Sequence, residues 1–174
     1  MTPPEDLPSP LARQAFCVGH VLTRATEVVA ALFLIAVIAM NLAQIFTRYV
    51  LVDPLSWTEE AMRYSTTWAV MLAGSAAVFR GEHMAIGLLD GLRSPLARRI
   101  HRMLVLACIG GFCLLLMWKG YPGAIENMRQ MSPAMRIPMT VPNLAVPVGA
   151  TLMFVKVLCL VLTDGRSPRE AVKP

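Results

Sequence analysis

The stretch ATEVVAALFLIAVIAMNLAQI at residues 25–45 decides the fold, because it holds one charged residue, Glu27, among 21 mostly apolar ones. An α-helix rises about 1.5 Å per residue, so about 20 such residues match the roughly 30 Å hydrocarbon core of a bilayer. The stretch therefore predicts a membrane-spanning helix over 25–46.

Further apolar runs predict spans at 60–79, 101–121 and 141–162. The second run is interrupted by Arg63, and the fourth carries Lys156, whose stem we expect to bring the ammonium out to the headgroups. With short connections and no room for a soluble domain, the sequence predicts an all-α integral membrane protein. Its expected architecture is four transmembrane helices in an up-down bundle, with a short interfacial segment between the second and third helices.

The composition supports this class. The hydrophobic fraction is 56% and the mean hydropathy is +0.57, above the range of about 45–50% apolar residues in soluble proteins. The net charge of +5 would suggest a nucleic-acid partner in a soluble protein, but the basic residues here lie in connections and tails beside the spans. We therefore expect no nucleic-acid binding.

The distribution of Lys and Arg predicts the orientation. The segments 1–24, 80–102 and 163–174 hold ten of the 16 basic residues, and the other connections hold four. The positive-inside rule then places both termini in the cytoplasm, with 1–24 as a lead-in, 25–162 as the membrane domain and 163–174 as a tail. The first apolar run is longer than the 7–15 residues of a signal peptide, so we expect it to be retained.

Four charged residues cluster in sequence near the expected outer ends of the first two helices: Arg48, Glu59, Glu60 and Arg63. A charge inside a membrane costs about 2.5–3.5 kcal/mol at mid-helix, so each one needs a reason. Arg63 follows both glutamates by about one helical turn, and an ion-paired helix end is one explanation. The other is that the cluster holds helices together or docks a partner.

Polar and small residues mark faces that should meet protein rather than lipid. Asn41 and Gln44 lie near the end of the first span, and the second span carries a small-residue face formed by Ala69, Ala73, Gly74 and Ala77. Small side chains allow close approach of helix backbones. Packing within the bundle and contact with a partner subunit both remain open.

The sequence offers no catalytic constellation. It has no HExxH, no Cys/His metal spacing, no CxxC pair and no glycine-rich phosphate loop, and its histidines fall at the edges of spans, where they could not ligate haem within a bundle. It also lacks the inverted repeats of a secondary transporter. We expect no enzyme activity, no cofactor and no bound metal, and a chain that assists another protein which carries out transport.

Four segments together resemble the small, Q-type membrane subunit of tripartite ATP-independent periplasmic (TRAP) transporters: NLAQIFTRYV, LSWTEEAMRY, GSAAVFRGEHMAI and RIPMTVPNLAVPVG. The residues that carry the resemblance are Asn41, Arg48, Tyr49, Trp57, Glu59, Glu60, Arg63, Gly74, Arg80, His83, Pro138 and Pro147.

The resemblance implies an accessory role in the inner membrane of a bacterium. In that family a large multi-span subunit carries the substrate and sodium sites, and a periplasmic binding protein delivers an organic acid. The small subunit is a scaffold for both, so substrate-binding residues are expected in the large subunit.

On this view the residues near the outer end stabilise the rim, with Tyr49 and Trp57 as interfacial anchors, and His83 with Arg80 orders the inner connection. The rival classes are a self-sufficient homo-oligomeric small transporter, for which Glu27 in the first turn of the first span is the nearest candidate carboxylate, and a four-helix redox protein or enzyme.

Overall fold

The computed structural model describes residues 10–52, 55–80 and 95–162, and its regular elements are all helical. The helices are α1 (Pro10–Phe46), the π-helical turn η1 (Thr47–Leu51), α2 (Ser56–Arg80), α3 (Pro95–Glu126), the 3-10 turn η4 (Asn127–Arg129), α4 (Thr140–Asn143) and α5 (Ala145–Leu162). The expected interfacial segment between the second and third helices falls largely on 81–94, outside the described residues.

Helix α1 is longer than the predicted span. It has 37 residues and begins at Pro10, so much of the predicted lead-in is helical. At about 1.5 Å per residue it is about 55 Å long, which exceeds the thickness of a bilayer core. Glu27 therefore lies well inside a helix, and the expectation that it occupies a first turn is wrong.

Helix α3 also exceeds its prediction. It begins at Pro95 and continues through Pro122 to Glu126. A proline is well suited to the first position of a helix, because the N–H group that it lacks would have no helical partner there. The predicted span ends at residue 121, whereas in the structure the outer connection begins only after η4.

The last predicted span is divided in two by a proline. Pro147 has no N–H to donate to the carbonyl of Asn143, and α4 ends at Asn143. The chain turns at Leu144, and helical bonding resumes with the Val148 amide donating to the Leu144 carbonyl at 3.0 Å.

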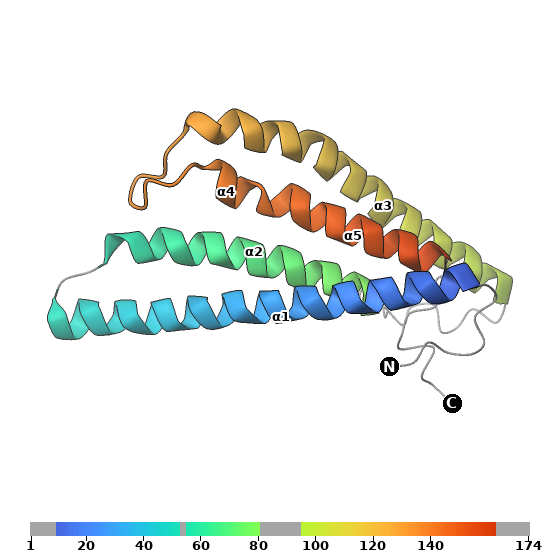
Figure 1. The fold of residues 1–174 in the computed structure, drawn as a ribbon, viewed down its shortest axis with the longest axis horizontal. Helices are drawn as coiled ribbons and strands as arrows, with labels where there is room; N and C mark the ends of the chain where they lie inside the picture. The colour runs from blue at the N-terminus through green and yellow to red at the C-terminus, as the bar shows by residue number, and fades with distance from the viewer. Residues whose placement is uncertain (1–9, 53–54, 81–94, 163–174) are drawn as a thin grey trace.

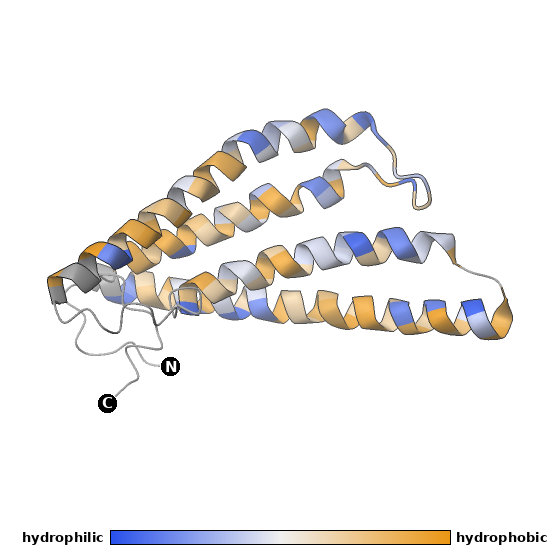
Figure 2. Ribbon diagram, turned by 180° about the vertical axis from the view of Figure 1, so that it is seen from behind, coloured by the Kyte–Doolittle hydropathy of each residue, from blue (hydrophilic) through white to orange (hydrophobic). Residues whose placement is uncertain are grey.

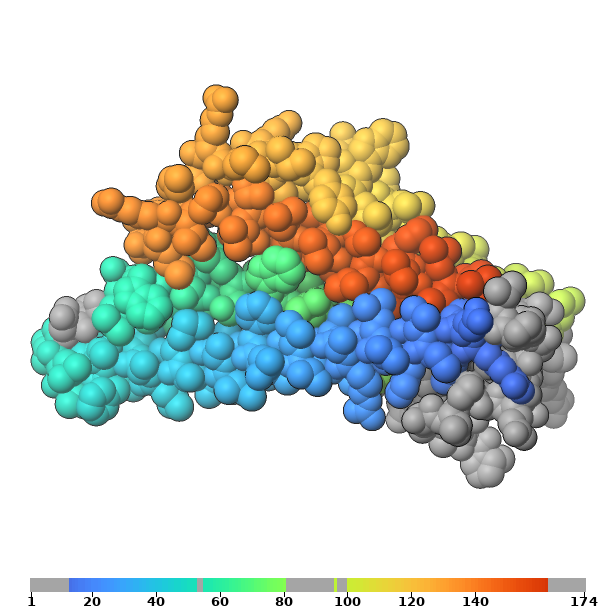
Figure 3. All heavy atoms as spheres, viewed as in Figure 1, coloured from blue at the N-terminus to red at the C-terminus, as the bar shows by residue number. Residues whose placement is uncertain are grey.

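The long helices alternate in direction, and α5 lies between α3 on one side and the α1–α2 pair on the other (Figure 1). Helix α3 packs mainly against α5, so the arrangement is more open than a closed four-helix bundle. Figure 3 shows α2 and α5 in side-chain contact between the outer rods α1 and α3. We call the end where α1 stops and α2 begins the outer end, and the opposite one the inner end.

The main apolar core lies toward the inner end, where all long helices converge (Figure 1). Its buried members come from each of them: Ala15, Val78, Phe79, Leu106, Val157, Cys159 and Leu160. Elsewhere large apolar side chains face outward, Leu32 at 60% and Leu115 at 61% exposure among them. Outward apolar surface of this extent suits lipid or a partner better than water.

Within the described residues, three segments are long and apolar enough to cross a membrane: Arg13–Leu51, Ile100–Arg129 and Thr140–Leu162. Helix α2 has the length, with 25 residues, but is not among them. The reason is its composition, because hydrophilic residues lie in the outer half of α2 (Figure 2). Three of the four predicted spans thus coincide with helical segments that are long and apolar enough to cross a membrane, and a crossing by α2 remains a prediction.

Candidate functional site

At the outer end, the carboxylate of Glu60 holds a loop that comes from the other side of the molecule. The Ser132 hydroxyl donates to Glu60 Oε2, and the backbone amides of Ala134 and Met135 reach the carboxylate at 3.3 and 3.1 Å. Hydrogen bonds to an ionised acceptor are stronger than neutral ones. We call this set the outer tie, and it joins α2 to the segment between η4 and α4.

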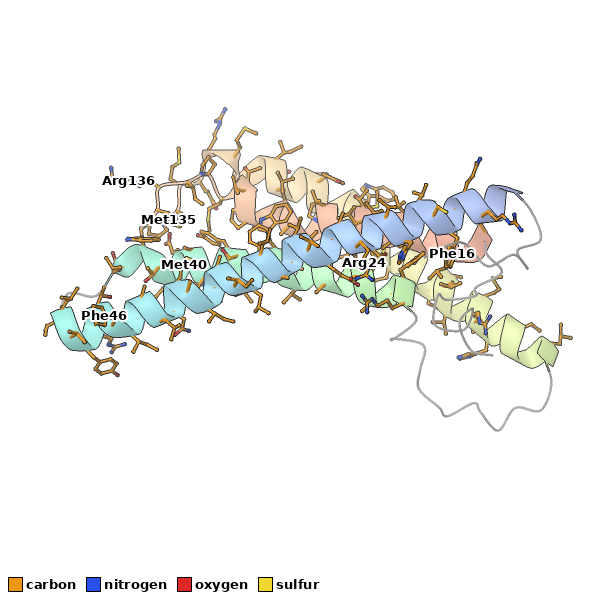
Figure 4. All side chains as sticks on the ribbon, turned by 60° about the horizontal axis from the view of Figure 1, so that its bottom comes forward. Phe16, Arg24, Met40, Phe46, Met135 and Arg136 are labelled. Carbon is orange, nitrogen blue, oxygen red and sulfur yellow. The ribbon has the colours of Figure 1, made fainter. Side chains whose placement is uncertain are left out.

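The loop is shaped so that it presents these donors. The Ser132 amide donates to the Ile137 carbonyl at 2.9 Å, and the Met139 amide donates to the Gln130 carbonyl at 2.9 Å, which closes a small hairpin. Arg136, at its tip, has φ of 53°, and its side chain is exposed. Figure 4 shows Met135 and Arg136 at the same end of the molecule as the start of α2.

The other members of the predicted outer cluster separate from Glu60. Glu59 accepts a hydrogen bond from Gln44 Nε2 at 3.3 Å and so links α2 to α1. The guanidinium of Arg48 lies 6.0 Å from the ring centre of Tyr49 within η1. Among the described residues, no ion pair within 4.0 Å joins Arg63 to either glutamate, and Arg63 acts on Glu60 only as a nearby positive charge.

The remaining outer candidates lie at the surface. Tyr49 is 74% exposed and Trp57 is 43% exposed, and Asn41 is exposed as well. Pro138 is half-buried and pairs with Met131 across the hairpin. The interfacial anchoring of Tyr49 and Trp57 stays a prediction.

Toward the inner end, Arg80 pairs with Glu27 of α1 at 2.5 Å. Sequence reasoning had placed Arg80 with His83, which lies outside the described residues. The ion pair fastens the end of α2 to the middle of α1. It also occupies the carboxylate that the rival self-sufficient transporter would need.

Lys156 contradicts our expectation that its ammonium reaches the headgroups. Its side chain is fully buried, and Nζ donates to Thr26 Oγ1 at 2.7 Å and to Ser75 Oγ at 3.0 Å. Those hydroxyls donate in turn to the carbonyls of Thr23 and Leu72. This set, the inner tie, joins α5, α1 and α2.

The inner tie was not predicted, although the sequence carries a signal for it. Thr26 and Ser75 are hydroxyl residues in apolar helices, and a lysine in a third apolar helix needs acceptors. What the sequence lacked was the relative rotation of the helices, which decides whether the groups face one another.

The small-residue face of α2 is divided between two neighbours. Gly74 faces α5, where a Cβ would lie 3.7 Å from Met153 Cε. Ala69, Ala73 and Ala77 instead line a groove of about 540 Å³ between α1 and α2. Pro147 is buried against α3, with its Cβ 3.1 Å from where a Cβ on Gly120 would lie.

No group of three His, Cys, Asp or Glu side chains in the described ranges is arranged to hold a metal ion. What the arrangement offers is mechanical: polar ties at both ends, separated by apolar packing. Such ties fix the relative position of helix pairs, because unpaired polar groups are costly in an apolar surrounding.

Comparison with known proteins agrees with this kind of molecule. Residues 37–166, more than half of the chain, match the family model described as "Tripartite ATP-independent periplasmic transporters, DctQ component". The chain is 25% identical over 100 residues to the C4-dicarboxylate TRAP transporter small permease protein DctQ of Vibrio cholerae serotype O1. That match covers 58% of this chain and 43% of the relative.

No solved structure matches the chain significantly. The family match, the apolar helices long enough to cross a bilayer and the order of the motifs agree with one another. The chain therefore belongs to the DctQ component family of tripartite ATP-independent periplasmic transporters and is a membrane protein of that transport system.

Proposed function

We propose that this chain is a non-catalytic scaffold that binds the large carrier subunit of a TRAP transporter. The transporter would use a sodium gradient to take up an organic acid that a periplasmic binding protein delivers. The observation that carries the proposal is the family match over residues 37–166. The substrate is left open, because the curated relative's C4-dicarboxylate belongs to that relative's name and only 43% of its length is matched.

The geometry supports a stationary role. The outer tie at Glu60 and the inner tie at Lys156 each join the α1–α2 pair to the α3–α5 side of the molecule. A carrier that moves a site across the bilayer needs a partner that does not move with it. A chain fixed at both ends is suited to that task.

The outer end is the proposed place for the binding protein to dock. The exposed residues Arg48, Arg63 and Arg136 lie there, beside the loop that Glu60 orders. We assign Tyr49 and Trp57 to the membrane interface at the same end, with both chain termini in the cytoplasm.

Reconstitution tests the proposal. This chain is purified together with a large TRAP subunit and a TRAP binding protein of the same organism, and sodium-driven uptake into liposomes is measured with each component omitted in turn. We expect the tagged chain to recover the large subunit in detergent, and uptake to require all components. Uptake by this chain alone would instead support the self-sufficient transporter.

A point substitution tests the docking role within this scheme. Arg136→Gln should raise the binding-protein concentration needed for half-maximal uptake without changing recovery of the large subunit, because its side chain is exposed on the loop tip. Arg13→Gln, an exposed arginine at the inner end, is the matched control. Equal effects of the two substitutions would remove the outer end from consideration as the docking face.

A further inference from the structure

We propose that the groove between α1 and α2 binds one anionic phospholipid, with an acyl chain along the groove and its phosphate beside Arg80 and Arg24. This inference concerns the lipid surroundings of the chain and does not depend on the identity of the large subunit or the substrate.

The groove has the chemistry of an acyl-chain site. Its volume is about 540 Å³, and its walls are formed largely by apolar side chains, most of them alanines: Ala30, Ala31 and Leu34 on α1, and Ala69, Ala73 and Ala77 on α2. Thr66, also in the lining, has its hydroxyl occupied by the Met62 carbonyl at 2.7 Å. An acyl chain in the groove would therefore leave no hydroxyl group of the lining without a hydrogen bond.

The length of the groove distinguishes a lipid from a partner helix. On α1 its lining runs from Glu27 to Val37, and on α2 from Thr66 to Arg80. At about 1.5 Å per residue these segments are about 15 and 21 Å long. One leaflet contributes about 15 Å, half of the roughly 30 Å core, whereas a transmembrane helix of a partner would need a groove across both leaflets.

The polar end of the groove lies where a headgroup would be. Glu27 and Arg80 form their ion pair at this end, close to the membrane boundaries predicted at residues 25 and 79. Beyond it, the lining toward Val37 is apolar apart from Thr66, whose hydroxyl donates to the Met62 carbonyl. A site that is charged at one end and apolar over the length of one leaflet has the polarity of a single phospholipid.

The charge at this end selects an anionic headgroup. Arg24 is exposed, precedes Glu27 by three residues and so lies on the same side of α1. It lies where α1 passes the end of α2 (Figure 4). Among the residues that the structure describes at this end, Arg24 and Arg80 carry two positive charges against the one negative charge of Glu27, and buried Lys156 adds a third positive charge behind them. Guanidinium groups bind phosphate oxygens in a bidentate manner.

Native mass spectrometry of the full chain in detergent tests the site, with dioleoyl phosphatidylglycerol and dioleoyl phosphatidylethanolamine titrated separately. Arg24→Gln should weaken phosphatidylglycerol binding about five-fold, as expected for one basic residue near an anionic lipid, and leave phosphatidylethanolamine binding unchanged. Arg48→Gln removes an exposed arginine at the other end of the same helical rod and should have no effect.

A second pair of variants tests the groove itself. Ala73→Leu fills the groove and should weaken binding of both lipids, whereas Ala43→Leu adds the same volume at an exposed position of α1 outside it. Unchanged lipid binding by Ala73→Leu, or equal effects of Arg24→Gln and Arg48→Gln, would overturn the proposal. Loss of large-subunit recovery by Ala73→Leu with lipid binding intact would overturn it too, and would assign the groove to a partner helix.

Discussion

Glu59 and Glu60 show how adjacent identical residues acquire different tasks. Successive residues of an α-helix point about 100° apart, so one carboxylate faces α1 and the other faces the loop that precedes α4. Glu59 receives one hydrogen bond, from Gln44, whereas Glu60 receives bonds from a hydroxyl and from backbone amides. The sequence alone treats the two as equivalent members of one cluster.

Removing Glu60 should release the loop. Hydrogen bonds to a charged group contribute about 1.5–3 kcal/mol each, so Glu60→Ala should speed amide exchange at Ala134 and Met135 by about ten-fold or more. Hydrogen–deuterium exchange on peptides covering 130–139 measures this. Glu59→Ala is the control, and a loop that is equally protected in both variants would show that Glu60 does not hold it.

The buried ammonium of Lys156 gives a prediction about the order of effects at the inner tie. Ser75→Ala removes an acceptor and leaves a buried donor unsatisfied, which costs about 1–3 kcal/mol. Lys156→Met removes the charge itself and keeps the volume, and replacing a buried charge with an apolar side chain is often nearly neutral.

We therefore expect Ser75→Ala to lower the thermal stability of the chain in detergent more than Lys156→Met does. We also expect Ser75→Ala to have little further effect in the Lys156→Met background, because the unsatisfied donor is then absent. Additive effects in this double-mutant cycle would mean that the two side chains do not interact.

At the level of elements, α5 is the helix that the others share, and glycine sets its distance from α2. A Cβ built on Gly149 would lie 2.7 Å from the Cβ of Met71, too close to be accommodated without a shift of one helix. On another side of α5, Gly120 allows α3 to pack closely, because a Cβ at Gly120 would lie 3.1 Å from the Cβ of Pro147. These contacts explain how an open row of helices still packs closely at its centre.

Gly149→Ala should therefore destabilise the chain by about 1–3 kcal/mol, the usual range for overpacking. Gly123→Ala is the matched control, because a Cβ at Gly123 would meet nothing within 4 Å. Thermal unfolding of both variants in the same detergent measures the difference. A melting temperature as high for Gly149→Ala as for Gly123→Ala would show that α2 and α5 lie farther apart than in this structure.

For the whole molecule, the two ties act on the relation between the α1–α2 pair and the α3–α5 side. The pairs converge toward the inner end and separate toward the outer end (Figure 1), where the loop at residues 132–135 reaches back to Glu60. Apolar contact is nondirectional, so lipid-facing rods could slide, whereas hydrogen bonds with fixed partners select one register.

Loss of the outer tie should therefore increase the motion of the α1–α2 pair relative to the α3–α5 side at the outer end only. Spin labels at Arg48→Cys and Arg136→Cys, in a background with the exposed Cys17 and Cys108 changed to Ser, report the distance between the two sides by double electron–electron resonance. Glu60→Ala should broaden that distance distribution and leave a pair at positions 13 and 104 unchanged. Identical broadening at both ends would indicate general loosening.

How much the sequence could predict depended on how local the cause was. Helix positions follow from runs of apolar residues within one segment, so residues 25–45 predicted a helix that the structure confirms within α1. The family was also predicted correctly, because the order and spacing of its motifs can be read directly from the linear sequence. The length of α1 and of α3 was underestimated, because polar residues that project beyond a bilayer can remain helical.

The sequence by itself determined that this chain is helical, apolar and a member of a membrane transport family, because hydropathy and motif spacing are properties of neighbouring residues. Only the tertiary structure decided which polar groups meet. Ser132 and Glu60 are 72 residues apart, and Lys156 and Thr26 are 130 residues apart. Their pairing depends on how each helix is rotated about its axis. A shift of one position along a helix turns the side chain by about 100°, so that it would face lipid instead of its partner in the tie.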